Sequence, residues 1–150
     1  GVRLVEYHFK VHKEKTGFWA RCMELEGCVT QGDSLKELEA NAQEALELFL
    51  SEPESSRILF ALPQKRPHSR QILKVRVPVG IAFAVLLKHL RVKRKLTQRE
   101  TADRLGLKNI SAYQRLESPK KANPELVTLA RVKKVFPEMR IDKVLESSAD

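Results

Sequence analysis

A short stretch near residue 110 carries polar side chains of the types that recognise the edges of DNA bases. Helical spacing turns Tyr113 and Leu116 inward, so that the positions between them face outward. The outward positions are Asn109, Ser111, Ala112, Gln114 and Arg115. Asparagine and glutamine can each form two hydrogen bonds with adenine, and arginine can do so with guanine. We therefore predict that Asn109, Gln114 and Arg115 read bases, with Ser111 exposed beside them.

Two short helices joined by a tight turn are expected to position these side chains. Thr97 and Glu100 form a capping box that begins the first helix, and Gly106 ends it. The second helix spans Asn109–Glu117, and such a pair forms a helix-turn-helix unit whose second helix enters the major groove. Some units of this kind serve only as protein docking sites. Nearby lysines are predicted to contact phosphates, which adds affinity without sequence information; they are Lys108, Lys120 and Lys121.

Further helices are predicted on both sides of this unit. Ile81–Lys93 forms one, and Asn123 and Pro124 supply the N-cap and first residue of another that ends at Phe136. Its buried side is predicted to consist of Leu126, Leu129, Val132 and Phe136. A tail containing Ile141, Val144 and Leu145 is expected to dock as a last helix. Five cations in and just after the predicted Ile81–Lys93 helix are expected to be solvated rather than bound to DNA; they are Lys88, Arg91, Lys93, Arg94 and Lys95.

Charge is divided unequally along the 150 residues, whose net charge is +9. Residues 1–56 contain 6 lysines and arginines against 11 carboxylates, a net −5, whereas the remainder contains 22 against 8, a net +14. Such a division predicts two modules with opposite electrostatic partners. Pro78 and Gly80 mark the expected hinge, so the predicted domains span residues 1–79 and 80–150.

The acidic half shows strand patterns interrupted by one helix. Apolar and polar residues alternate over Leu4–Val11, and further strands are predicted at Phe18–Met23, Cys28–Gln31 and Ile72–Val77. A helix spans Ser34–Leu50 and begins with an S-x-x-E capping box. Residues 54–71 form an irregular connection. The predicted fold class is an α+β N-terminal domain of order β-β-β-α-β, followed by an all-α helix-turn-helix domain.

Catalytic chemistry is not expected in the acidic half. His8 and His12 lie on one strand about 13 Å apart, too far to share a metal, and are interpreted as exposed. Two-metal nuclease chemistry needs converging carboxylates, of which the first strand offers only Glu6. Glu24 and Glu26 lie in a turn. We predict no enzyme activity, no cofactor and no metal site.

The cysteines and the hydropathy indicate the compartment. Cys22 and Cys28 are interpreted as buried free thiols in a reducing cytosol, with a disulfide or redox role as the alternative. No apolar run approaches the roughly 18 residues of a membrane span, and no signal-peptide pattern is present. The prediction is a cytoplasmic protein without a membrane partner.

A longer motif surrounds the predicted helix-turn-helix unit. It consists of Leu96-Thr97-Gln98, Glu100, Ala102 and Leu105-Gly106, followed by Arg115-Leu116-Glu117 and Asn123-Pro124. This pattern, over about residues 81–137, resembles the lambda-repressor-like (XRE) family of DNA-binding domains. The resemblance implies that Gln98 contacts a phosphate. Thr101 departs from the family, which usually has an aliphatic residue at that position.

A second motif lies in the acidic half. Gly17-Phe18-Trp19 is followed by Leu25–Ser34, which reads L-E-G-C-V-T-Q-G-D-S, and by Leu38–Leu46, which reads L-E-A-N-A-Q-E-A-L. This pattern closely resembles the HicB antitoxin family. The resemblance implies a degraded ribonuclease-H-like fold without activity, a small basic HicA-like ribonuclease toxin as partner, and repression of the chain's own operon. An acidic domain suits a cationic partner through charge complementarity.

Three residues are proposed for toxin contact: Trp19, Glu24 and Glu26. Core packing is the preferred interpretation of Trp19, and solvated surface that of both glutamates. Asn41 is predicted to bond back to the sheet. A homodimer or dimer of dimers is expected, because two-fold operators match two-fold proteins. The alternative function is a free-standing dimeric transcriptional repressor whose N-terminal domain senses a small ligand.

Overall fold

The computed structural model describes residues 6–51, 59–63 and 71–146. Its first half contains strands β1 (Glu6–Lys13), β2 (Phe18–Cys22), β3 (Val29–Gly32) and β4 (Ile72–Arg76), with helix α1 (Leu35–Leu50) between β3 and β4. The helices that follow are α2 (Val79–Lys93), α3 (Gln98–Arg104), α4 (Ile110–Leu116), α5 (Leu126–Val135) and α6 (Ile141–Leu145). The predicted α+β class is confirmed. Leu4 and Val5, and most of the irregular connection, lie outside the described residues.

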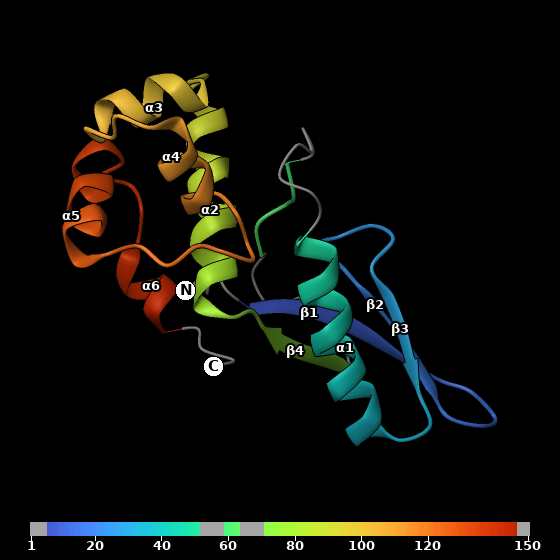
Figure 1. The fold of residues 1–150 in the computed structure, drawn as a ribbon. Coiled ribbons are helices and arrows are strands. Elements are labelled where there is room, and N and C mark those ends of the chain that lie inside the picture. The colour runs from blue at the N-terminus through green and yellow to red at the C-terminus, as the bar shows by residue number, and fades with distance from the viewer. Residues whose placement is uncertain (1–5, 52–58, 64–70, 147–150) are drawn as a thin grey trace.

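The strands form one antiparallel sheet in the order β3-β2-β1-β4, and α1 packs across one face of it (Figure 1). The register pairs Phe9 with Cys22 on one side and with Leu73 on the other, so these side chains share the helix-facing surface. Helical spacing supplies the opposing layer, which consists of Leu38, Ala42, Leu46 and Leu50, each at most 2% exposed. The N-terminal core therefore lies mainly between α1 and the sheet, and Phe60 and Leu62 also pack against it.

Hydrogen bonds fix the start of α1 against β3. The Ser34 side chain accepts a bond from the backbone N–H of Glu37 at 3.1 Å, as the capping motif predicts. The Glu37 carboxylate reaches one residue further back than in a standard box and accepts from the backbone N–H of Asp33 at 2.9 Å. Asn41 donates from Nδ2 to the carbonyl of Gln31 at 2.7 Å, so the predicted bond back to the sheet is confirmed.

Pro78 and Gly80, the predicted boundary between the two modules, lie at the start of α2: Pro78 is its N-cap and Gly80 lies in its first turn. One expectation for the helical half is wrong. Asn123 and Pro124 do not begin the next helix, because the chain stays extended as far as Glu125, which is the N-cap of α5. Leu126 consequently leaves the predicted apolar side and is 83% exposed.

Buried apolar side chains form one cluster that continues from the sheet into the helices. Val77, just after β4, is 1% exposed, and Ile81 and Phe83 of α2 are 6% and 2% exposed. The same cluster reaches Val132 and Phe136 at the end of α5. The oppositely charged halves of the chain therefore share a core across residue 79.

Two glycines allow a test of how closely α1 approaches β3. A Cβ on Gly32 would lie 2.7 Å from the backbone nitrogen of Leu38, whereas a Cβ on Gly27 would meet only a Phe49 ring atom at 3.8 Å. Gly27 has the positive φ of +90°, so a view based on backbone conformation alone ranks Gly27→Ala as the more harmful change. We expect the reverse: about 3 kcal/mol lost for Gly32→Ala and about 1 kcal/mol for Gly27→Ala, measured by urea unfolding. The opposite ranking would show that α1 can shift away from β3.

Candidate nucleic-acid and protein-binding sites

Helix α4 presents most of its predicted base-reading positions outward. Tyr113 and Leu116 are 0% and 7% exposed, which confirms that they face inward. Ser111, Gln114 and Arg115 are exposed, as are the flanking lysines Lys108, Lys120 and Lys121. The arrangement leaves a polar and cationic surface on the outer side of α4.

Asn109 and Gln98 are held by local hydrogen bonds. Asn109 is the N-cap of α4, and its Oδ1 accepts a bond from the backbone N–H of Ser111 at 2.8 Å. Two-pronged pairing of Asn109 with adenine would require this cap to open. Gln98 Oε1 accepts a bond from Gln114 Nε2 at 3.2 Å, so the predicted phosphate-contacting residue and a predicted base reader lie side by side. This contact links the start of α3 to the outer side of α4.

A buried carboxylate joins three helices beneath this surface. Glu117, whose side chain is 4% exposed, contacts Arg91 Nε at 2.5 Å and Arg91 Nη2 at 3.0 Å. It also accepts a hydrogen bond from the Tyr113 hydroxyl and one from Gln98 Nε2 at 3.3 Å. Burial and the adjacent carboxylate raise the pKa of Tyr113 well above its ordinary value, so its hydroxyl stays a donor. The Glu117 network therefore fixes α4 relative to α2 and α3.

The Glu117 network corrects the prediction that Arg91 is solvated. Its side chain is only 13% exposed, and its Nη1 also donates to the carbonyl of Leu96 at 2.9 Å. Arg94 is also engaged, since its guanidinium lies 4.8 Å from the centre of the Phe136 ring and 2.6 Å from Glu138. Thr101, the unusual residue of the motif, is fully buried, and its hydroxyl donates to the carbonyl of Thr97 at 2.9 Å. A threonine is thus accommodated without an unpaired hydroxyl.

Glu24 is buried in a pair with His8, which corrects two expectations. The Glu24 carboxylate lies 2.7 Å from His8 Nδ1 and accepts a bond from the backbone N–H of His8 at 2.9 Å. The two side chains are 1% and 5% exposed, so His8 is not a solvent-exposed histidine and Glu24 is not solvated surface. Cys22 and Cys28 are free and buried beside this pair, which confirms their interpretation as buried free thiols.

Glu26 is exposed in the same turn and precedes Gly27, which lines a shallow pocket. The pocket has a volume of about 240 Å³ and is lined by Gly27, Cys28, Val29, Ala45, Leu48 and Phe49. Leu48 and Val29 are 66% and 55% exposed, and Glu44 lies one helical turn before Leu48 on the same side of α1. We call Glu26, Glu44 and Leu48 the acidic-apolar patch; Val29 borders the pocket at the β3 edge, but its pairing with Arg21 turns its side chain to the other face of the sheet. Sequence patterns missed the patch because Leu48 lies off the buried stripe of α1.

Trp19 is not in the core, contrary to the preferred interpretation. It lies on the sheet face opposite α1, only partly buried, and its ring stacks on that of His12 with centroids 4.1 Å apart. Neither residue belongs to the buried apolar cluster.

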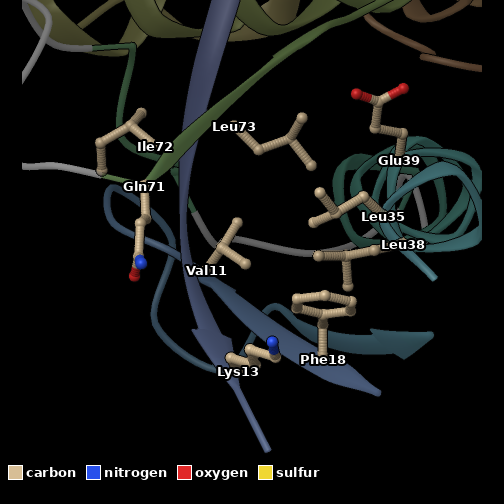
Figure 2. Close-up of a pocket in the computed structure, with 9 residues that line it drawn as sticks. All are labelled: Val11, Lys13, Phe18, Leu35, Leu38, Glu39, Gln71, Ile72 and Leu73. Atoms are coloured by element: carbon tan, nitrogen blue, oxygen red, sulfur yellow. The ribbon is translucent and has the colours of Figure 1, made fainter. Parts of the chain in front are cut away.

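A second pocket lies between α1 and the β1–β4 side of the sheet, with a volume of about 290 Å³ (Figure 2). Its wall is mainly apolar and includes Val11, Phe18, Leu35, Leu38 and Leu73. Lys13, Glu39 and Gln71 supply the polar groups among the labelled residues. The combination can accommodate a small amphiphilic molecule.

Comparison with known proteins identifies the family. The chain is 36% identical over 74 residues to a UPF0150 protein of Helicobacter pylori, a match that spans 92% of that relative and 49% of this chain. The chain belongs to the UPF0150 family. UPF0150 is the HicB-like family, so this level of the predicted resemblance is confirmed. No family model matches the chain.

Two further properties of this UPF0150 chain bear on its chemistry. In the described ranges no three His, Cys, Asp or Glu side chains lie close enough together to hold a metal ion. The helices in those ranges are all too short or too polar to cross a membrane.

Replacement of Glu117 by glutamine tests the network that holds α4 in this UPF0150 protein. The change leaves the Arg91 guanidinium buried without its counter-charge, so we expect the free energy of unfolding to fall by about 3 kcal/mol. Circular dichroism during urea titration would measure this loss. The matched control is Glu138→Gln, which breaks a pair whose carboxylate side chain is 42% exposed and which should cost less than about 1 kcal/mol. Similar losses in both variants would contradict the role assigned to Glu117.

Proposed function

We propose that this chain is a HicB-type antitoxin that binds and neutralises a small basic HicA-like ribonuclease toxin and represses its own operon. The observation that carries the proposal is membership of the UPF0150 family. The protein acts by binding rather than by catalysis, and it needs no cofactor. The partner classes are one basic protein and one operator DNA.

The acidic-apolar patch is the surface on which we place the toxin. Interfaces are commonly anchored by apolar side chains at their centre and steered by charges at their rim. Leu48 supplies exposed apolar area here, and Glu26 and Glu44 supply negative charge beside it. Glu24 is buried and Trp19 lies on the opposite sheet face, so neither forms part of this surface.

The outer side of α4 is the surface on which we place operator DNA. Arg115 and Gln114 are exposed base readers, while Gln98, Lys108, Lys120 and Lys121 contact phosphates. Asn109 and Ser111 lie at the start of the same helix. Leu126 and Val127 of α5 are 83% and 61% exposed, and we assign them to contacts between copies in the expected dimer.

The pocket in Figure 2 favours a second candidate function, a free-standing repressor that senses a small ligand. An apolar cavity with a lysine and a glutamate at hand is a typical small-molecule site. This candidate shares the DNA-binding half with the first and differs in the partner of the acidic half.

Capture from a lysate of the native host, treated with nuclease and using the full-length chain, tests the toxin proposal. We expect one small basic protein in near-equal amount. The double variant Glu44→Lys, Leu48→Asp should weaken capture at least about tenfold, because it removes the apolar anchor and reverses a steering charge. Glu14→Lys, in the exposed β1–β2 turn, is the control for charge and should bind normally. Recovery of no protein, while the chain still binds its promoter, would favour the ligand-sensing repressor.

Replacement of Arg115 by alanine tests the DNA proposal. If Arg115 reads a guanine, binding to the operator weakens by about 1–3 kcal/mol while binding to unrelated DNA changes little. Lys120→Ala, which removes a predicted phosphate contact, should weaken both by a similar factor and reduce the salt dependence. Titrations of operator and scrambled duplexes at several salt concentrations separate the two results. An equal loss on both duplexes for Arg115→Ala would make it a phosphate contact.

A further inference from the structure

The sheet face turned away from α1 carries an aromatic and cationic surface that the antitoxin function does not use. Strand alternation places Tyr7, Phe9 and Ala20 under α1, and the residues between them on the outer face. We call six of these outer residues the Trp19 face: Lys10, His12, Trp19, Arg21, Gln31 and Lys74.

The charge of the Trp19 face is opposite to that of its domain. The outer face carries a fourth cation, Arg76, in addition to Lys10, Arg21 and Lys74. The nearby carboxylate of Glu6 is 9% exposed and is shared between Lys74 at 3.9 Å and Arg76 at 3.7 Å. The Glu24 carboxylate also reaches this side of the sheet, where it is buried against His8, and the remaining described carboxylates of the acidic half lie on α1 and in the turns. A basic protein would therefore meet repulsion here, whereas a polyanion would be attracted.

The aromatic pair offers a surface for stacking. His12 and Trp19 are cross-strand partners, and their rings are 4.1 Å apart and inclined by 13°. That separation is close to the spacing of neighbouring strands, so the rings stand side by side and the second face of the indole points toward β3. The residue paired with Trp19 on β3 is Gln31, whose side chain is exposed. A flat ring placed next to the indole on the β3 side would extend the stack beside the exposed Gln31 carboxamide.

We propose that the Trp19 face binds single-stranded RNA, with a base stacked on Trp19 and phosphates held by Lys10, Arg21 and Lys74. Aromatic residues on an open sheet, surrounded by cations, bind unpaired bases by stacking and the backbone by charge. Bases in duplex DNA are already stacked on one another, so they gain little from stacking on the partly buried indole. Most unpaired bases in a cell belong to RNA, so we propose RNA rather than DNA as the ligand of this face.

Fluorescence of the full-length protein tests this directly, because Trp19 is the single tryptophan of the chain. Titration with a 12-nucleotide oligouridylate should quench the emission in a saturable way, since the base stacks on the indole. Arg21→Gln should weaken binding several-fold and lower the slope of log K against log salt by about 0.7, the value for one phosphate contact on a single strand. Lys36→Gln, which removes an exposed cation from α1, is the matched control and should leave both quantities unchanged.

A labelled oligouridylate provides a second readout that does not depend on tryptophan emission. Its fluorescence anisotropy should show about tenfold weaker binding to Trp19→Ala, within the range expected for loss of one stacked base, and a smaller loss for Trp19→Phe. Binding without quenching that disappears in Arg115→Ala would place the RNA on α4 and overturn the proposal. Equal effects of Arg21→Gln and Lys36→Gln, or tighter binding of oligothymidylate or duplex DNA, would also overturn it.

Discussion

A single helix, α1, packs on a sheet of four strands that is wider than the helix, and this difference in width determines where the N-terminal half leaves surface pockets. Strands are spaced about 4.8 Å apart, so four of them present a face well over 10 Å wide, whereas a helix with its side chains is about 10 Å across. Helix α1 buries its stripe of Leu38, Ala42, Leu46 and Leu50 at the centre. The margins on either side of it remain incompletely filled. The two pockets lie at these margins, one beside β3 and the other toward β4.

The helical half has a different physical constraint, because it contains a buried charge, the Glu117 carboxylate. Glu117 is desolvated, and such a carboxylate is tolerated only when its oxygens are fully engaged. Arg91, Tyr113 and Gln98 supply the partners from α2, α4 and α3. The geometry required by these bonds leaves few orientations for α4. The Glu117 network therefore holds the exposed side chains of Arg115 and Gln114, where we propose that DNA binds, in defined positions.

Local features of the fold could be predicted from the sequence, and long-range ones could not. The capping box at Thr97 and the turn at Gly106 depend on residues within one or two turns of each other, and strand β1 is predicted by its local pattern, although burial along it does not alternate. His8 and Glu24 are 16 residues apart, and Arg91 and Glu117 are 26 apart, so their pairing depends on the assembled fold. The same limit explains Trp19, because no local pattern says which face of a sheet a helix will cover. The prediction of where α5 begins failed for a different reason. Asn123 and Pro124 form a good local capping signal, but the chain remains extended as far as Glu125.

The shared core across residue 79 has a consequence for stoichiometry. Val77, Ile81 and Val132 belong to one buried cluster. The acidic-apolar patch and the outer side of α4 are therefore connected through a shared core rather than by a flexible linker. In an operator-bound pair the two patches would then stand at a separation dictated by the spacing of the half-sites. Whether one toxin molecule or two can occupy such a pair becomes a question of shape and excluded volume. If the proposed function holds, the distance between major grooves would limit the number of toxin molecules bound as much as the affinity of either surface would.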